Sequence, residues 1–96
     1  MPKVVKLTGE DGLWLFHCPG CGHDHWFNDA ENDHNRPVWK WNGDVDKPTV
    51  TPSVLVNNHT PEQRCHLFIK EGRIQFLNDC HHTLRGRTVD MEEYED

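Results

Sequence analysis

The four cysteines of this 96-residue chain are the residues whose type and spacing point most directly to a chemistry. Cys18 and Cys21 are separated by a Pro-Gly dipeptide, and a tight turn of this kind can direct both thiolates at one metal ion. Cys65 and Cys80 lie at the two ends of a segment with the pattern of a β-hairpin. Together the two pairs would form a tetrahedral shell of four sulfurs at Zn–S distances of about 2.3 Å. We therefore predict a structural Zn²⁺ site formed by Cys18, Cys21, Cys65 and Cys80.

Two other uses of the cysteines stay open. A Cys-x-x-Cys pair can be a redox centre, but such a centre needs a helix N-terminus to lower the pKa of its first thiol, and no helical pattern follows Cys21. A disulfide needs an oxidising compartment. The first residues lack the apolar run of a signal peptide, and no segment approaches the roughly 20 apolar residues of a membrane span. We expect a cytoplasmic protein without membrane contact, which favours metal binding over disulfides.

Histidines and one carboxylate supply a second set of candidate site residues. The chain has eight histidines, and one of them could replace a thiolate in a Cys₃His site. His66 alternates to the opposite strand face from Cys65, whereas His82 shares parity with Cys80 if the strand continues. The alternative to a closed site is a metal-dependent hydrolase or nuclease with an open coordination position, in which a carboxylate acts as general base. The residues for it are His25, His66, Asp79 and His82.

Composition limits the function classes. The length fits one domain over residues 1–96, and an apolar content of 34% allows only a small core, for which a metal cross-link is a plausible support. The formal net charge of −6 opposes electrostatic binding of nucleic acid. A weak nucleic-acid binder is therefore our third hypothesis.

The apolar residues alternate with a period of two, so we predict a mostly β fold: a small zinc-stapled antiparallel β domain with a zinc-ribbon-like knuckle and a hairpin. The clearest element is the hairpin of residues 65–70 and 73–77, whose Glu-Gly loop pairs Leu67 with Phe76 and Ile69 with Ile74. Counting on by twos places Cys65 and Cys80 on the same face. Further strands are expected at residues 4–7, 13–17, 25–27, 38–41 and 49–56.

Prolines and tryptophans mark a candidate surface. Pro48 and Pro52 cannot donate ladder hydrogen bonds, so they confine the strand at residues 49–56 to an edge or a bulge. Trp39 and Trp41 share one face of the preceding strand, where they are either core residues or a partner surface. Pairing of the sheet edge with a second copy would also give a homodimer.

Several segments together resemble a known family. They are the Cys-Pro-Gly-Cys knuckle, residues 39–44 with 47–49, residues 51–54, the Cys65-His66 pair, residues 71–77 and residues 79–89. Over about residues 13–89 the chain resembles a family of small uncharacterised proteins found mainly in tailed phages and prophages, sometimes labelled ammonia monooxygenase. A more distant resemblance is to proteins encoded near bacterial ubiquitin-like conjugation genes.

The family pattern includes all four cysteines and the histidines at His25, His66 and His82. His81 stands where the family commonly has threonine, so the resemblance disfavours it as a ligand. The oxygenase label implies copper or iron chemistry, which no residue pattern here supports. The conjugation-gene relation would suit protein recognition. We therefore favour a non-enzymatic, phage-type structural-zinc domain that acts as a protein-interaction or host-modulating module on a host or phage protein, in the host cytoplasm if it is phage-encoded.

Overall fold

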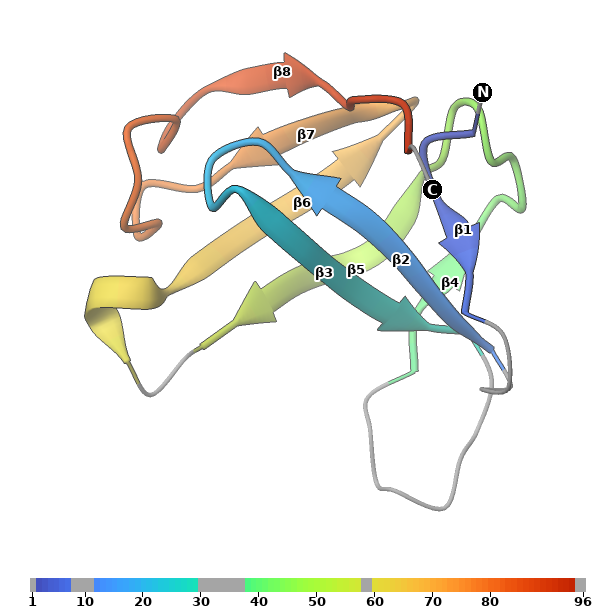
Figure 1. Cartoon of the computed structure of the whole chain (residues 1–96), viewed down its shortest axis with the longest axis horizontal. Helices are drawn as coiled ribbons and strands as arrows, with labels where there is room; N and C mark the ends of the chain where they lie inside the picture. The colour runs from blue at the N-terminus through green and yellow to red at the C-terminus, as the bar shows by residue number, and fades with distance from the viewer. Residues whose placement is uncertain (1, 8–11, 30–37, 58–59, 95–96) are drawn as a thin grey trace.

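The computed structural model describes residues 2–7, 12–29, 38–57 and 60–94. Across these residues the chain forms two antiparallel sheets and no α-helix (Figure 1), which confirms the mostly β prediction. The first sheet has the order β1 (Val5–Lys6), β2 (Leu13–Cys18), β3 (His23–Asn28). The second sheet has the order β4 (Lys40–Trp41), β5 (Val50–Val56), β6 (Cys65–Lys70), β7 (Arg73–Phe76), β8 (Thr88–Asp90), and a 3₁₀ turn, η1 (Pro61–Gln63), precedes β6.

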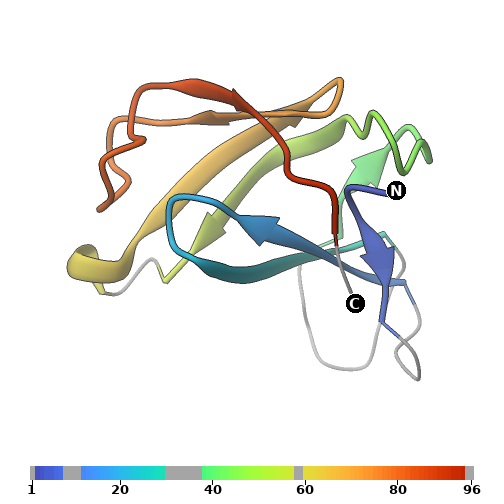
Figure 2. The same ribbon diagram turned by 45° about the horizontal axis from the view of Figure 1, so that its top comes forward.

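The core lies between the two sheets, which Figure 2 shows as two layers. Alternate residues of β2 and β3 face this core, including Phe16 and Phe27, and they meet the inward residues Leu67, Ile69 and Phe76 of the second sheet. All five side chains are buried, as the period-two pattern requires when one face of each sheet is covered. In the part of the chain that the structure describes, no helix has the length and apolar character of a membrane span.

The hairpin of β6 and β7 has the predicted register, with Leu67 opposite Phe76 and Ile69 opposite Ile74. Its loop residues Glu71 and Gly72 both have positive φ, 49° and 77°, as a tight two-residue hairpin turn requires. The strand ends at Phe76, and the chain then bends. Face parity therefore cannot be counted on from β7 to Cys80.

Strand β5 carries a bulge, one of the two alternatives that its prolines left open. Its register with β6 is Val50 opposite Ile69 and then Val54 opposite Leu67, so three residues of β5 face one residue of β6. Pro52 lies in this interval, where its missing N–H costs no regular ladder bond. A bulge bends the strand and re-aims the side chains within it, and the side chain that follows Pro52 is Ser53.

Candidate functional site

One group of metal-ligating side chains lies at the end of the sandwich where the β2–β3 turn meets the second sheet. It consists of Cys18, Cys21, Cys65 and His82, whose ligand atoms all lie within 4.8 Å of one another. The Sγ atoms of Cys18 and Cys65 are 3.9 Å apart, and Cys65 Sγ is 3.6 Å from His82 Nε2. Two sulfurs bound to one tetrahedral zinc ion stand about 3.8 Å apart. The four residues therefore lie close enough to hold a metal ion.

The sequence of the knuckle, residues 18–22, positions two members of the group, Cys18 and Cys21. Cys18 ends β2, and its carbonyl accepts a hydrogen bond of 2.8 Å from the N–H of Gly22, which adopts φ of 78° to close the turn. The N–H of Cys21 donates to Cys18 Sγ at 3.4 Å. A Cβ on Gly20 would overlap the imidazole of His82, so this glycine leaves the space in which the fourth ligand lies. All four cysteines are free thiols, with no disulfide among them.

Contacts and burial within the metal-ligating group shift the pKa values of its four side chains. Hydrogen bonding from Cys65 lowers the pKa of the Cys18 thiol far below its usual value, with a smaller contribution from His25. The same contact raises the pKa of Cys65, and burial raises the pKa of Cys21 to about 12. Burial also lowers the pKa of His82, so its ring is neutral near pH 7. A bound cation would remove the repulsion that opposes a second and third thiolate in this small volume.

The fourth member of the group is His82, whereas the sequence predicted Cys80. Cys80 Sγ accepts a hydrogen bond of 3.1 Å from the N–H of His66 and donates one of 3.0 Å to the carbonyl of His66. Because the chain bends after Phe76, Cys80 faces the backbone of β6 and His82 reaches the sulfurs. His82 Nδ1 accepts from the N–H of Leu84 at 3.2 Å. Ligation through Nε2 puts the ring proton on Nδ1, so metal binding must break that hydrogen bond.

Other histidines surround the group without joining it. His25 is 1% exposed, packs edge-on against Phe16 and His23, and has no partner for its Nε2. His81 is exposed, with its Nε2 3.4 Å from Cys21 Sγ.

A second cluster lies on the opposite face of the second sheet, and it joins His66 and Asp79, which the sequence suggested, to Ser53, which it did not. Ser53 Oγ is 2.9 Å from His66 Nε2, and His66 Nδ1 is 3.2 Å from Asp79 Oδ2. Since a carboxylate only accepts, Nδ1 carries the ring proton and Nε2 accepts from the serine hydroxyl. This is the connectivity of a hydrolytic Ser-His-Asp triad, in which the base lies between nucleophile and carboxylate. The His66 and Asp79 side chains are 23% and 43% exposed, so solvent and substrate can reach them.

The two clusters divide the polar set that the sequence suggested for a metal-dependent hydrolase. His66 and Asp79 lie together with Ser53, while His82 lies with the three cysteines and His25 is buried beside them. Sequence reasoning missed Ser53 as a site residue, although residues 51–54 are among the segments that resemble the family, because that resemblance assigned the segment no chemical role. One signal was present: Ser53 is the only serine of the chain, and it follows a proline in a strand.

The two tryptophans for which the sequence left core packing and a partner surface open, Trp39 and Trp41, are both half-buried. Trp41 packs against Trp14 with ring centroids 4.7 Å apart, and its Nε1 donates to Asp29 Oδ2 at 2.8 Å. Trp39 Nε1 donates to the carbonyl of Ser53 at 3.1 Å, so this indole fixes the backbone at the serine.

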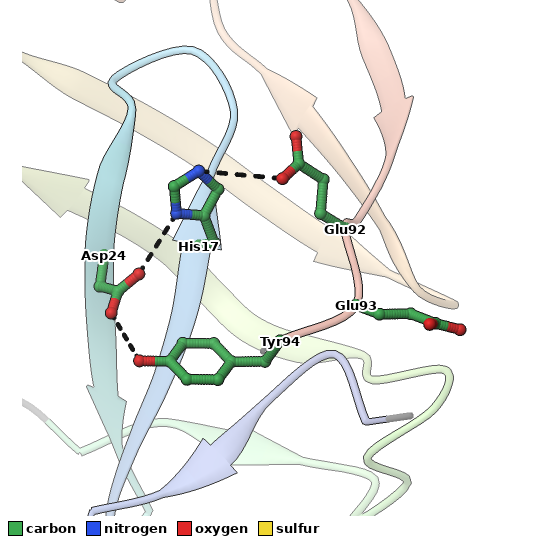
Figure 3. A pocket seen from close by; sticks show the side chains of 5 residues that line it. All are labelled: His17, Asp24, Glu92, Glu93 and Tyr94. Carbon is green, nitrogen blue, oxygen red and sulfur yellow. Dashed lines mark hydrogen bonds and ion pairs between the residues drawn. The ribbon is translucent and has the colours of Figure 1, made fainter. Parts of the chain in front are cut away.

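A third polar cluster lines a cavity of about 530 Å³ beside the first sheet (Figure 3). His17 Nδ1 lies 3.3 Å from Asp24 Oδ1, and Tyr94 Oη donates to Asp24 Oδ2 at 2.6 Å. The Tyr94 N–H also donates to the carbonyl of Pro2 at 2.7 Å. These contacts hold residues near the end of the chain against β2 and β3, and no serine or cysteine lines the cavity. The cluster therefore holds the segment around Tyr94 in place, and it contains no serine or cysteine that could act as a nucleophile.

The ligand set predicts the effects of two substitutions. We expect His82→Ala to lose the metal and unfold, because metal binding in small zinc domains contributes about 10 kcal/mol or more to folding. Cys80→Ser should keep one metal ion, since a hydroxyl can replace both hydrogen bonds to the His66 backbone. Co²⁺ absorption and thermal melting measure both effects, with His81→Ala as the control for the neighbouring histidine. Metal retained in His82→Ala and lost in Cys80→Ser would restore the four-sulfur shell.

The pKa shifts predict proton release on metal binding. Near pH 7 Cys18 is already a thiolate and His82 is neutral, whereas Cys21 and Cys65 carry protons because their pKa values are raised. Ligands must be deprotonated, so we expect about two protons released per Zn²⁺ bound and an affinity that rises with pH. Calorimetry in buffers of different ionisation enthalpy measures this number. Release of no protons would contradict the proposed protonation states.

A comparison with known proteins bears on the second cluster. The family model described as "Bacterial ubiquitination-like system serine protease (BubE)" matches residues 1–77. This range includes Ser53 and His66 and ends shortly before Asp79. No curated protein and no solved structure matches the chain. With most of its length matched, the chain belongs to the BubE family of bacterial ubiquitination-like system serine proteases.

Proposed function

We propose that this protein is a serine protease with Ser53 as nucleophile, His66 as general base and Asp79 as the carboxylate that orients the base. The observation that carries the proposal is the continuous chain of contacts from Ser53 Oγ to His66 Nε2, at 2.9 Å, and from His66 Nδ1 to Asp79 Oδ2, at 3.2 Å. The family description names the same class of chemistry, and the only serine of the chain occupies the nucleophile position.

The mechanism follows from these contacts. His66 Nε2 removes the hydroxyl proton as Ser53 Oγ attacks the carbonyl carbon of the scissile bond, and it returns that proton to the leaving group. Asp79 holds the proton on Nδ1 and stabilises the imidazolium that forms. Water then releases the acyl group from Ser53 by the same proton transfers in the second half of the reaction.

The metal centre has a structural role in this proposal, and we infer that its ion is Zn²⁺. Three cysteines and one histidine would hold the ion with the four ligands typical of structural zinc, which would leave no position for substrate. The ion would supply folding free energy and cross-link the knuckle of the first sheet to β6 and to the segment after β7. The protein-interaction role and phage origin suggested by the sequence stay predictions.

Active-site labelling tests the nucleophile. A fluorophosphonate probe should modify the protein once, at Ser53, and Ser53→Ala should abolish both labelling and peptide or ester hydrolysis. Loss of a triad nucleophile lowers kcat by about a thousandfold or more. Thr51→Ala, which removes a hydroxyl from the same strand, is the matched control and should be labelled normally. Equal hydrolysis by wild type and Ser53→Ala would exclude the serine mechanism.

The carboxylate is tested by Asp79→Asn. The amide can donate to the histidine and select the wrong tautomer, so we expect kcat to fall by about 10²–10⁴-fold while KM changes little. Asp90→Asn is the control, because Asp90 is an exposed carboxylate whose 3.1 Å ion pair with Arg73 lies outside the triad. Unchanged melting temperatures for both variants would assign the loss to chemistry, and an unchanged kcat for Asp79→Asn would remove Asp79 from the triad.

A further inference from the structure

Strand β5 has a free edge beside the nucleophile. β4 pairs with β5 only through Lys40 opposite Thr51 and Trp41 opposite Val50. Beyond Thr51, no strand within the described ranges borders β5 on the side away from β6. The indole of Trp39 satisfies the carbonyl of Ser53. The edge that follows can pair with an added strand, which is how many proteins bind extended peptides.

An apolar groove of about 240 Å³ follows this edge. Trp26 of β3 forms one side, and its side chain is 52% exposed. Leu55 of β5 is 42% exposed. Among the described residues, three large apolar side chains are exposed, and two of them, Trp26 and Leu55, line this one groove. The lining residues are Trp26, Trp39, Val54, Leu55, Val56 and Asn57.

The groove is continuous with the triad. Val54 follows Ser53 directly, and Leu55 lies opposite His66 in the ladder. Trp39 both lines the groove and binds the Ser53 carbonyl. At about 3.3 Å per extended residue, the lined part of β5 spans about three residues of a bound strand.

We propose that this groove selects the substrate: it binds an extended polypeptide segment that has a large apolar side chain within about three residues of the scissile bond. The main chain of the segment adds to the free edge of β5, and its apolar side chain packs between Trp26 and Leu55. This inference rests on the proposed protease function. The alternation of side chains along an added strand sends every second substrate residue to the same side, so one apolar position is selected while its neighbours stay permissive.

Binding tests the groove without requiring turnover. Pentapeptides with leucine at one position in turn, and otherwise glycine and serine, are added to ¹⁵N-labelled Ser53→Ala protein. We expect one leucine peptide to shift the amide signals of residues 54–57 and to bind at least about tenfold more tightly than the leucine-free peptide. Trp26→Ala should reduce this preference at least about fivefold, and Trp26→Phe should restore most of it. Gln75→Ala, on β7, is the control and should not change it.

The outcomes separate the groove from the triad. Three results would reject the groove as the substrate site: equal binding of leucine and leucine-free peptides, shifts confined to other residues, or self-association of the protein through Trp26. Labelling of Ser53 would still support the protease function in each case. Selective binding by a protein that the fluorophosphonate fails to label would support the groove as a peptide site and reject the hydrolytic function. Cleavage of fluorogenic versions of the same peptides should show the same leucine preference in kcat/KM.

Discussion

The alternation of side chains along β6 is the constraint on which both sites depend. Cys65 faces the space between the sheets and joins the metal-ligating group, while His66, the next residue, faces outward to Ser53 and Asp79. A β-strand requires this opposition, so fixing the position of Cys65 also fixes the side on which His66 lies. The metal-ligating group and the triad therefore share one strand, and each occupies its own face of the sheet.

The segment after β7, residues 79–82, also sends side chains to both faces of the sheet. Asp79 accepts from His66, Cys80 binds both backbone groups of His66, and His82 reaches the sulfurs on the other side. Cys80 thus acts as a positioning residue in the proposed mechanism: it holds the backbone from which the base projects. Since a triad loses activity when its members move by about 1 Å, a metal ion that anchors Cys65 and His82 would support catalysis without touching the substrate.

Much of the fold could be predicted from the sequence, because period-two patterns and a Glu-Gly turn are local signals. The β6–β7 register was predicted correctly from Leu67, Ile74 and Glu71, and Pro52 left an edge or a bulge as the alternatives for β5, of which the structure has the bulge. For the fourth member of the metal-ligating group the sequence favoured Cys80 and left His82 as an alternative, because counting by twos assumes a strand beyond Phe76, where the chain bends and His82 lies near the sulfurs. The triad escaped prediction for a related reason. Ser53, His66 and Asp79 meet only through the pairing of β5 with β6 and the bend after β7, and no motif around any one of them encodes that meeting.

The chain order Ser-His-Asp differs from the orders found in chymotrypsin-like, subtilisin-like and α/β-hydrolase enzymes, so the triad is identified by its contacts. Its members come from residues 53–79, a short span in which neighbouring strands supply nucleophile and base. Such compactness has a physical consequence. A domain with so small a core has little packing to hold three side chains in place, and a metal ion bound by the inner cluster would add a cross-link close to the base of the triad. The two clusters therefore depend on each other: a metal ion on the inner face of the sheet would hold in position the strand from which His66 projects on the outer face.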